Sequence, residues 1–291
     1  PPRSTLSSSS AASDVYKRQA RGGVEYVPPI SLAFWRWFFV FLILLPFFYS
    51  EIYKKRKFLK KEFYKLFFLG LMGCGVCGAF PFIAGMSTTM ANMGIIYTSS
   101  PVFIVILSVF LFSEKISLNR IVGLIICLIG VITIITKGNF NYLINFSFTT
   151  GDFWMLGAAI GWALYSIYLL NWKSKFSLMG RFTLIAFFGF ISLFPFYILE
   201  ESLFFDTKFN STFLAWVLFA AISPGIIAFS LYTKVQRYLG ASLTGFTLYL
   251  FAVYGAIFGI ILFEEMLLPF HYYGGALVFA GVYIARKIKT I

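Results

Sequence analysis

The chain has 291 residues, of which 59% are hydrophobic and only 12% are charged. A soluble domain has about half apolar and a quarter charged residues, and it could not bury this much apolar surface. The net charge of +13 comes from basic residues in short loops between long apolar runs, which excludes the basic face of a nucleic-acid-binding protein. The composition therefore predicts a polytopic, all-α integral membrane protein.

Residues 1–23 do not share this pattern. The run PPRSTLSSSSAASDVYKRQA begins without Met, has no apolar core and lacks the signal-peptide order of charge, apolar run and cleavage site. We therefore expect residues 1–23 to be a disordered or non-native leader and exclude them from the fold.

Nine apolar stretches follow, each bounded by charged or turn residues, and each is a candidate transmembrane helix. They cover residues 30–49, 66–85, 92–112, 121–136, 152–170, 182–199, 213–233, 242–263 and 272–285. The charge-free stretch 66–113 is long enough for two spans with a tight turn between them.

Basic residues divide unequally between alternate loops. One set of loops contains most of the Lys and Arg, including the KKRKFLKK segment after residue 53 and the C-terminal residues Arg286, Lys287 and Lys289. The other set, apart from the run PPRSTLSSSSAASDVYKRQA, contains Arg21, Lys137 and Lys208 together with most of the acids. By the positive-inside rule we expect a cytoplasmic C-terminus and location in a bacterial inner (plasma) membrane.

The chain also contains a repeat. Adding 151 to the numbers of residues 91–134 places them on residues 242–285, and the identical pairs include Glu114 with Glu265, Gly123 with Gly274, and Gly130 with Gly281. Equal spacing of the acid and the two glycines in both copies predicts a transporter built from two similar halves, with its site where they meet.

The helix expected over 152–170 has no counterpart in the first half at this offset. We infer that a first helix is missing, so that nine visible helices belong to a ten-helix bundle. Five helices per half also make the halves opposite in orientation, as alternating access requires. Residues 24–137 then form the first repeat without its first helix, 138–151 an external linker and 152–291 the second repeat.

Several of these features resemble one family. The run PPISLAFWRW, the P-x12-E spacing from Pro101 to Glu114, the G-x6-G that follows and their recurrence in the second half resemble the EamA branch of the drug/metabolite transporter superfamily. The resemblance covers the chain from about Val24 onward. It implies two inverted five-helix repeats that move small organic solutes such as amino acids, commonly outward.

Backbone-breaking residues lie at related positions in the two halves. Gly73 and Gly75, with Pro81 after them, interrupt one predicted span, and Pro224 and Gly225 interrupt another. At the offset of 151, Gly73 falls on Pro224. These residues are candidate hinges near the membrane midplane. Close packing of helices through small residues explains the same pattern and stays an alternative.

Polar and aromatic residues within the spans are candidates for binding substrate. Arg36 could snorkel to the outer headgroups or hold a carboxylate inside the bundle, and the resemblance keeps the second role open. The remaining candidates could line an aromatic cavity suited to an amino acid, although Trp and Tyr also form interface belts. The full predicted set is Arg36, Tyr97, Ser99, Trp162, Tyr165 and Tyr249.

The sequence thus predicts a secondary active transporter that exports an amino acid or similar metabolite. The alternative is a nucleotide-sugar or sugar-phosphate antiporter, which needs several cations facing the cavity, whereas the sequence places only Arg36 there. A membrane-embedded lipid enzyme is disfavoured, because the chain has one His and no catalytic cluster of acids.

No catalytic residue, metal site or cofactor is expected, and the C-x-x-C of Cys74 and Cys77 indicates packing. The expected partners are a small-molecule substrate and the lipid bilayer, not nucleic acid. The protein is expected to be a monomer or a homodimer.

Overall fold

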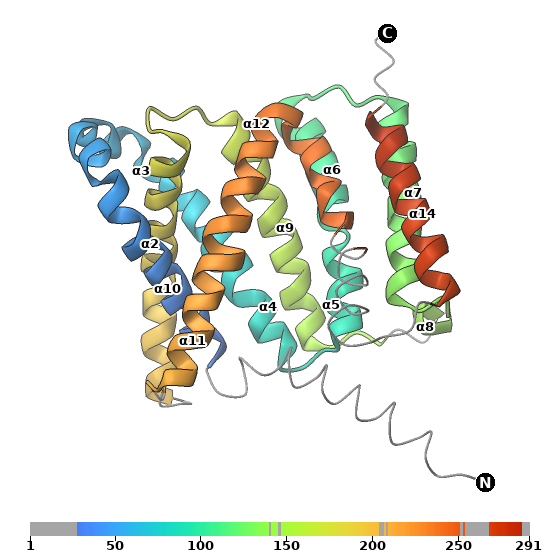
Figure 1. The fold of residues 1–291 in the computed structure, drawn as a ribbon, viewed down its shortest axis with the longest axis horizontal. Helices are drawn as coiled ribbons and strands as arrows, with labels where there is room; N and C mark the ends of the chain where they lie inside the picture. The colour runs from blue at the N-terminus through green and yellow to red at the C-terminus, as the bar shows by residue number, and fades with distance from the viewer. Residues whose placement is uncertain are drawn as a thin grey trace.

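A computed structural model describes residues 28–139, 141–144, 147–203, 207, 209–250, 253 and 268–286. Within these ranges the chain forms helices joined by turns, and Figure 1 shows most of them side by side in one bundle. The leader predicted for residues 1–23 and most of the span predicted for residues 242–263 lie outside the described residues.

The first half of the chain contributes the helices up to the linker. They are α2 (Pro29–Lys54), α3 (Arg56–Gly70), the π-helical turn η1 (Leu71–Val76), α4 (Cys77–Gly85), α5 (Met90–Tyr97), α6 (Ser100–Phe112) and α7 (Leu118–Ile135). The second half follows the short helix α8 (Asn141–Ile144). It contains α9 (Thr150–Asn171), α10 (Leu178–Leu203), α11 (Ser211–Ala220), the π-helical turn η2 (Ala221–Ala228), α12 (Phe229–Gly245) and α14 (Pro269–Arg286).

Seven helical stretches in the described residues are long and apolar enough to cross a bilayer. They coincide with the first seven predicted spans, and two of them, Arg56–Gly85 and Ser211–Gly245, contain a π-helical turn. The second stretch is kinked at Gly240, whose φ of 80° is not helical. The span predicted for residues 272–285 lies within α14, which is helical but not among the seven.

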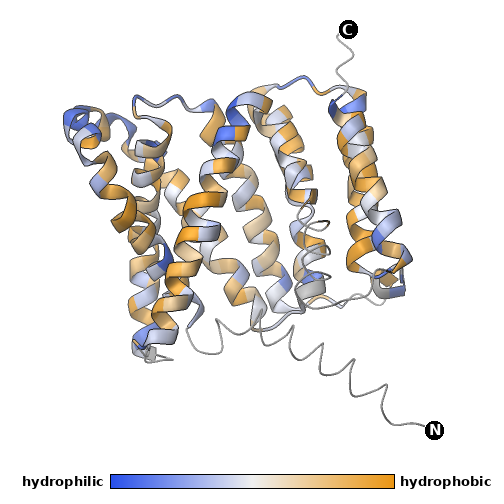
Figure 2. Ribbon diagram, viewed as in Figure 1, coloured by the Kyte–Doolittle hydropathy of each residue, from blue (hydrophilic) through white to orange (hydrophobic). Residues whose placement is uncertain are grey.

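The outer surface of the bundle is apolar. Phe47 and Phe110 expose 77% and 81% of their surface, which would be costly in water but suits contact with lipid tails. Figure 2 shows hydrophobic residues along the length of the helices and hydrophilic residues mainly near their ends. These exposed side chains are consistent with an integral membrane protein.

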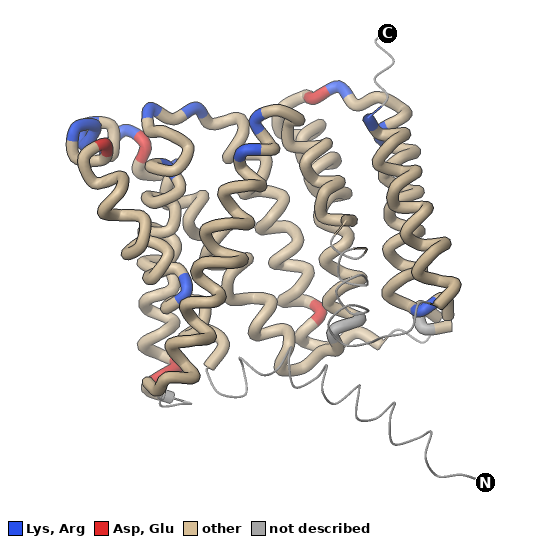
Figure 3. The backbone as a smooth tube through the Cα atoms, viewed as in Figure 1, with Lys and Arg blue, Asp and Glu red and all other residues tan. Residues whose placement is uncertain are grey.

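Charged residues are distributed unequally between the two ends of the bundle. Figure 3 shows most of the Lys and Arg of the described residues at one end, where α14 also finishes. We call it the basic end. The loops that contain most of the Lys and Arg therefore lie at the same end of the described bundle, as expected where consecutive helices cross it in alternating directions.

Helices α7 and α14, which the offset of 151 makes counterparts, pack against each other in antiparallel orientation (Figure 1). A Cβ added to Gly123 would lie 2.5 Å from the carbonyl oxygen of Gly281, and one added to Gly130 would lie 2.7 Å from that of Gly274. Only glycine permits so close an approach of the two backbones. When each residue is replaced by its counterpart at the offset of 151, the Gly123–Gly281 contact becomes the Gly274–Gly130 contact. The two helices therefore contribute equivalent residues to the interface.

A single residue pair lies at the centre of this interface. Cys127 donates a hydrogen bond of 3.4 Å from its Sγ to the carbonyl oxygen of Val278, its own counterpart at the offset of 151. A residue that contacts its own counterpart lies beside the axis of a two-fold relation. The described parts of α7 and α14 have the geometry expected of a local two-fold axis at this point.

Helices α2 and α10 are also counterparts, and they also pack antiparallel. Near the start of α2, the backbone N–H of Ser31 donates to Glu200 at 2.7 Å, and near its end Glu51 accepts from the backbone N–H of Ser177 at 2.6 Å. The two helices therefore touch along their length in opposite directions. Between these ends the Phe34 ring stacks on Tyr197 with centroids 4.5 Å apart.

Candidate functional site

The two π-helical turns occupy equivalent positions in the two halves. Shifted by 151, η1 covers residues 222–227, which lie within η2. The candidate hinge residues Gly73 and Gly75 lie in η1, Pro224 and Gly225 lie in η2, and Pro81 follows in α4. Proline removes a backbone donor and prevents regular α-helical bonding, and π-helical turns occur frequently at functional sites.

Each π-helical turn lies near one of the predicted binding residues. A Cβ on Gly73 would lie 2.5 Å from the ring of Tyr165, so the ring packs directly on the η1 backbone. A Cβ on Gly225 would lie 2.8 Å from Val40 and 3.9 Å from Nε of Arg36. A change in η1 would therefore move the Tyr165 ring, whereas η2 packs on Val40, one helical turn from Arg36.

Arg36 is the eighth residue of α2, roughly 10 Å along the helix from its first residue. Its side chain is half-buried, and its Nε is buried without a hydrogen-bond partner among the described residues. The two salt bridges found in those residues join Lys55 to Glu51 and Arg120 to Glu114. Arg36 is therefore a cation inside the bundle that no described acid pairs.

The surroundings of the Arg36 guanidinium are aromatic and weakly polar. Its Cζ lies 4.7 Å from the centroid of the Trp37 ring, a cation–π contact. Tyr97 at the end of α5 and Cys74 in η1 lie within electrostatic range. Neither neighbour neutralises the Arg36 charge as a carboxylate would, so the surroundings of Arg36 favour binding of an anionic ligand.

Helices α9 and α12 contribute an aromatic wall with an internal hydrogen-bond network. Trp162 packs on Tyr232 at 4.9 Å and on Tyr165 at 5.5 Å between ring centroids. Ser166 and Tyr232 share a hydrogen bond of 2.7 Å, and Nε2 of Gln236 donates to both the carbonyl and the hydroxyl oxygen of Ser166 at 2.7 Å. These bonds fix the orientation of the wall.

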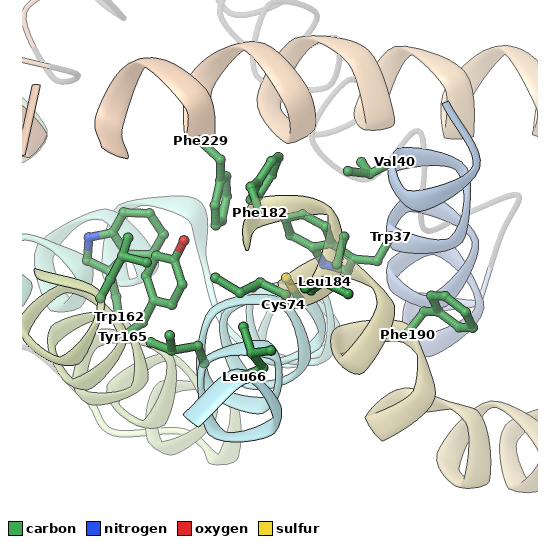
Figure 4. Packing of buried hydrophobic residues seen from close by; sticks show 14 of the residues in the cluster. Trp37, Val40, Leu66, Cys74, Trp162, Tyr165, Phe182, Leu184, Phe190 and Phe229 are labelled. Atoms are coloured by element: carbon green, nitrogen blue, oxygen red, sulfur yellow. The ribbon is translucent and has the colours of Figure 1, made fainter. Parts of the chain in front are cut away.

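Figure 4 shows how this wall meets the apolar core. The Trp162 and Tyr165 side chains face Phe229, with centroid distances of 5.2 and 5.8 Å, and Cys74 lies between them and Trp37. A cavity of about 310 Å³ extends from Tyr165 between α9, α10 and α12 toward the basic end. Its volume is at the lower end of the range for small-molecule pockets.

The remaining predicted residues lie apart from this wall. Ser99, at the break between α5 and α6, is half-buried and donates a hydrogen bond of 2.6 Å to the carbonyl of Ile96. Tyr249 is fully buried in a second apolar cluster with Phe246, whereas Trp162 and Tyr165 belong to the first. The structure thus brings Trp162 and Tyr165 into contact, places Tyr97 within electrostatic range of Arg36, and puts Tyr249 in the other cluster.

Tyr232 and Gln236 of the wall were not among the residues predicted from the sequence. Gln236 lies beyond the predicted span, which ended at residue 233 because Lys234 and Arg237 follow, whereas α12 continues past Gln236 to a kink at Gly240. The i, i+4 spacing of Tyr232 and Gln236, which puts both on one helix face, was the available signal.

Comparison with known proteins gives distant curated relatives that are all described as transporters, two of which cover most of this chain. The chain is 26% identical over 230 residues to an "Uncharacterized transporter" of Methanothermobacter thermautotrophicus, covering 78% of this chain and 65% of that protein. It is 26% identical over 197 residues to the "Uncharacterized transporter YetK" of Bacillus subtilis, covering 68% of this chain and 60% of the relative. The chain thus spans less than two thirds of the length of either relative.

A solved crystal structure has the same fold, with a TM-score of 0.71 at 17% identity over 95% of both chains. The sequence model of the EamA-like transporter family matches twice, over residues 7–136 and 149–286. The first match begins within residues 1–23, the expected leader. Because the two matches cover most of the chain, the chain belongs to the EamA-like transporter family of the drug/metabolite transporter superfamily.

Proposed function

We propose that the protein is a secondary carrier that exports a small organic solute with a carboxylate group, such as an amino acid, across a bacterial plasma membrane. The observation that carries the proposal is Arg36, a cation within the bundle that no described acid pairs and that lies 3.9 Å from the Cβ position of Gly225 in η2. An unpaired intramembrane cation is costly, and binding a carboxylate offsets that cost.

Transport would proceed by alternating access between two inverted halves. The reciprocal glycine contacts of α7 and α14 and the antiparallel packing of α2 on α10 support the inversion. The equivalent π-helical turns η1 and η2 would then be hinges, one in each half, that open the central site to opposite membrane faces.

The solute would lie between Arg36 and the aromatic wall. Arg36 would hold its carboxylate, while Trp162 and Tyr165 would contact its apolar part and Tyr97 would supply a hydroxyl. The basic end of the bundle, where α14 finishes, would face the cytoplasm by the positive-inside rule.

A second candidate is exchange of phosphorylated sugars on the same architecture. The sequence alone disfavours this candidate, because it places only Arg36 at the cavity. In the structure Lys173, Arg181 and Arg237 line the cavity at the basic end, which favours an anion of higher charge more than the sequence did. The first proposal keeps priority because these three cations lie at the end of the bundle and not beside the π-helical turns.

The test is transport by the purified full-length protein in proteoliposomes. Vesicles preloaded with a panel of unlabelled amino acids are diluted into the same labelled amino acids, and counterflow is measured against protein-free vesicles. We expect at least one amino acid to accumulate transiently. If no amino acid moves while labelled sugar phosphates exchange, the second candidate replaces the first.

A further inference from the structure

Three cations line the cavity between α9, α10 and α12. Lys173 and Arg237 are exposed at its rim, whereas Arg181 is 7% exposed at its inner side. Tyr165 also lines this cavity and packs on Gly73, so its inner end borders the candidate binding wall. The cavity joins the basic end of the bundle to that wall.

Arg181 is held in a fixed position. Its Nη1 donates a hydrogen bond of 2.8 Å to the carbonyl of Leu169, in the last turn of α9, where carbonyl groups lack intrahelical partners. Its Nε is buried without a hydrogen-bond partner among the described residues. The guanidinium is therefore fixed in position and still has an N–H donor without a hydrogen-bond partner among the described residues. Such a group can bind an additional hydrogen-bond acceptor.

The acid within electrostatic range, Glu62, does not supply the missing hydrogen-bond acceptor for Arg181. Glu62 lies within electrostatic range of Arg181, but its oxygens accept from the Ser174 hydroxyl at 2.6 Å and the Lys175 backbone N–H at 2.9 Å. Glu62 is also not among the residues that line the cavity, and no acid is found in the described lining. The space in front of Arg181 thus has a positive potential that low-dielectric walls strengthen.

We propose that this cavity is an anion-binding vestibule, in which Arg181, Lys173 and Arg237 hold the oxyanion group of a solute on its way between the basic end and Arg36. The oxyanion is a carboxylate or phosphate. The solute route rests on the proposed function, whereas the anion site itself does not. Arg181 gives directional hydrogen bonds to the group, and the two exposed cations attract it from solution.

The vestibule can be tested without a transport assay by placing a cysteine in the cavity and comparing the rates at which anionic and cationic reagents label it. Leu170 lines the cavity and is 36% exposed, so Leu170→Cys puts a reactive thiol there. Its labelling rate is measured with anionic 2-sulfonatoethyl and cationic trimethylammonioethyl methanethiosulfonates, each relative to free cysteine. The chain without Leu170→Cys controls for Cys74, Cys77 and Cys127. We expect the anionic reagent to be favoured several-fold and the preference to weaken at high salt.

Substitutions identify the cations responsible. Arg181→Gln and Lys173→Gln are expected to reduce the preference for the anionic reagent several-fold. Arg181→Lys is expected to keep most of the preference for the anionic reagent. This result would show that Arg181→Gln acts through loss of the positive charge and not through unfolding of the protein. Lys175→Gln is the matched control, because Lys175 is exposed in the same loop but does not line the cavity. An equal effect of Lys173→Gln and Lys175→Gln, or no effect of Arg181→Gln, overturns the proposal.

Protection of Leu170→Cys by small anions against labelling shows whether the ligand of the cavity is a soluble anion or a lipid headgroup. In phosphatidylcholine vesicles, millimolar acetate or inorganic phosphate is expected to slow labelling of Leu170→Cys, methylammonium is not, and Arg181→Gln is expected to remove the protection. If neither anion protects and only added phosphatidylglycerol does, the ligand is a lipid and the proposal fails. If the vestibule shows this selectivity while no amino acid is transported, the proposed function alone fails.

Discussion

Arg36→Met is expected to lower transport by about tenfold to a hundredfold without lowering the stability of the fold. A hydrogen bond to a charged group contributes about 1.5 to 3 kcal/mol, and each 1.4 kcal/mol is a factor of ten. A central Arg costs about 2.5 to 3.5 kcal/mol to insert, and no described acid offsets that cost at Arg36. Initial rates in proteoliposomes and thermal unfolding in detergent measure the two effects.

Arg36→Lys provides the matched control. It keeps the charge but loses the planar fork that can hold a carboxylate through two hydrogen bonds, so an intermediate transport rate is expected. If Arg36 instead snorkels to the outer headgroups, Arg36→Met transports normally. A normal rate in Arg36→Met would therefore contradict the assignment of Arg36 to the solute.

Gly73→Ala is expected to impair both the fold and transport. Its Cβ would lie 2.5 Å from Cδ2 and 2.6 Å from Cε2 of Tyr165, so the ring or the η1 backbone must shift. Overpacking of this kind costs about 1 to 3 kcal/mol. Because Tyr165 lines the cavity, the shift also displaces a candidate binding residue. Thermal unfolding and counterflow of the same preparation measure the two losses.

Gly85→Ala is the matched control for Gly73→Ala, because a Cβ at Gly85 meets nothing within 4 Å and the two residues lie in one continuous helix. It is expected to behave as the unmodified protein. Adding Tyr165→Leu to Gly73→Ala should restore stability but not transport, since it removes the clash and the binding ring together. Full activity of Gly73→Ala alone would contradict the packing of the ring on η1.

The membrane class and the first seven spans were predictable because apolar run length is a local property of the sequence. The offset of 151 likewise placed Gly73 on Pro224, and the structure puts both residues in π-helical turns. Their role as hinges stays a prediction, because the position of a backbone irregularity does not establish that it moves.

The cavity could not be predicted, because its residues meet only through packing. Arg181 directly precedes the predicted span 182–199, so in the sequence it counts among the basic loop residues whose charge the membrane topology explains. Its burial follows from the contact of α10 with the end of α9, where Leu169 offers a free carbonyl. Tyr249 lies in the second cluster, which the sequence does not indicate, because a deep aromatic position does not say which of two clusters it belongs to. Its binding role stays a prediction.

Competition by analogues of the transported amino acid tests most directly whether a carboxylate is what Arg36 binds. Counterflow of the labelled solute is measured with its unlabelled acid, its amide and its decarboxylated amine as competitors, at equal concentrations. The acid alone is expected to compete strongly, because only it carries the charge that offsets the unpaired guanidinium. Equal competition by the decarboxylated amine would contradict this role of Arg36.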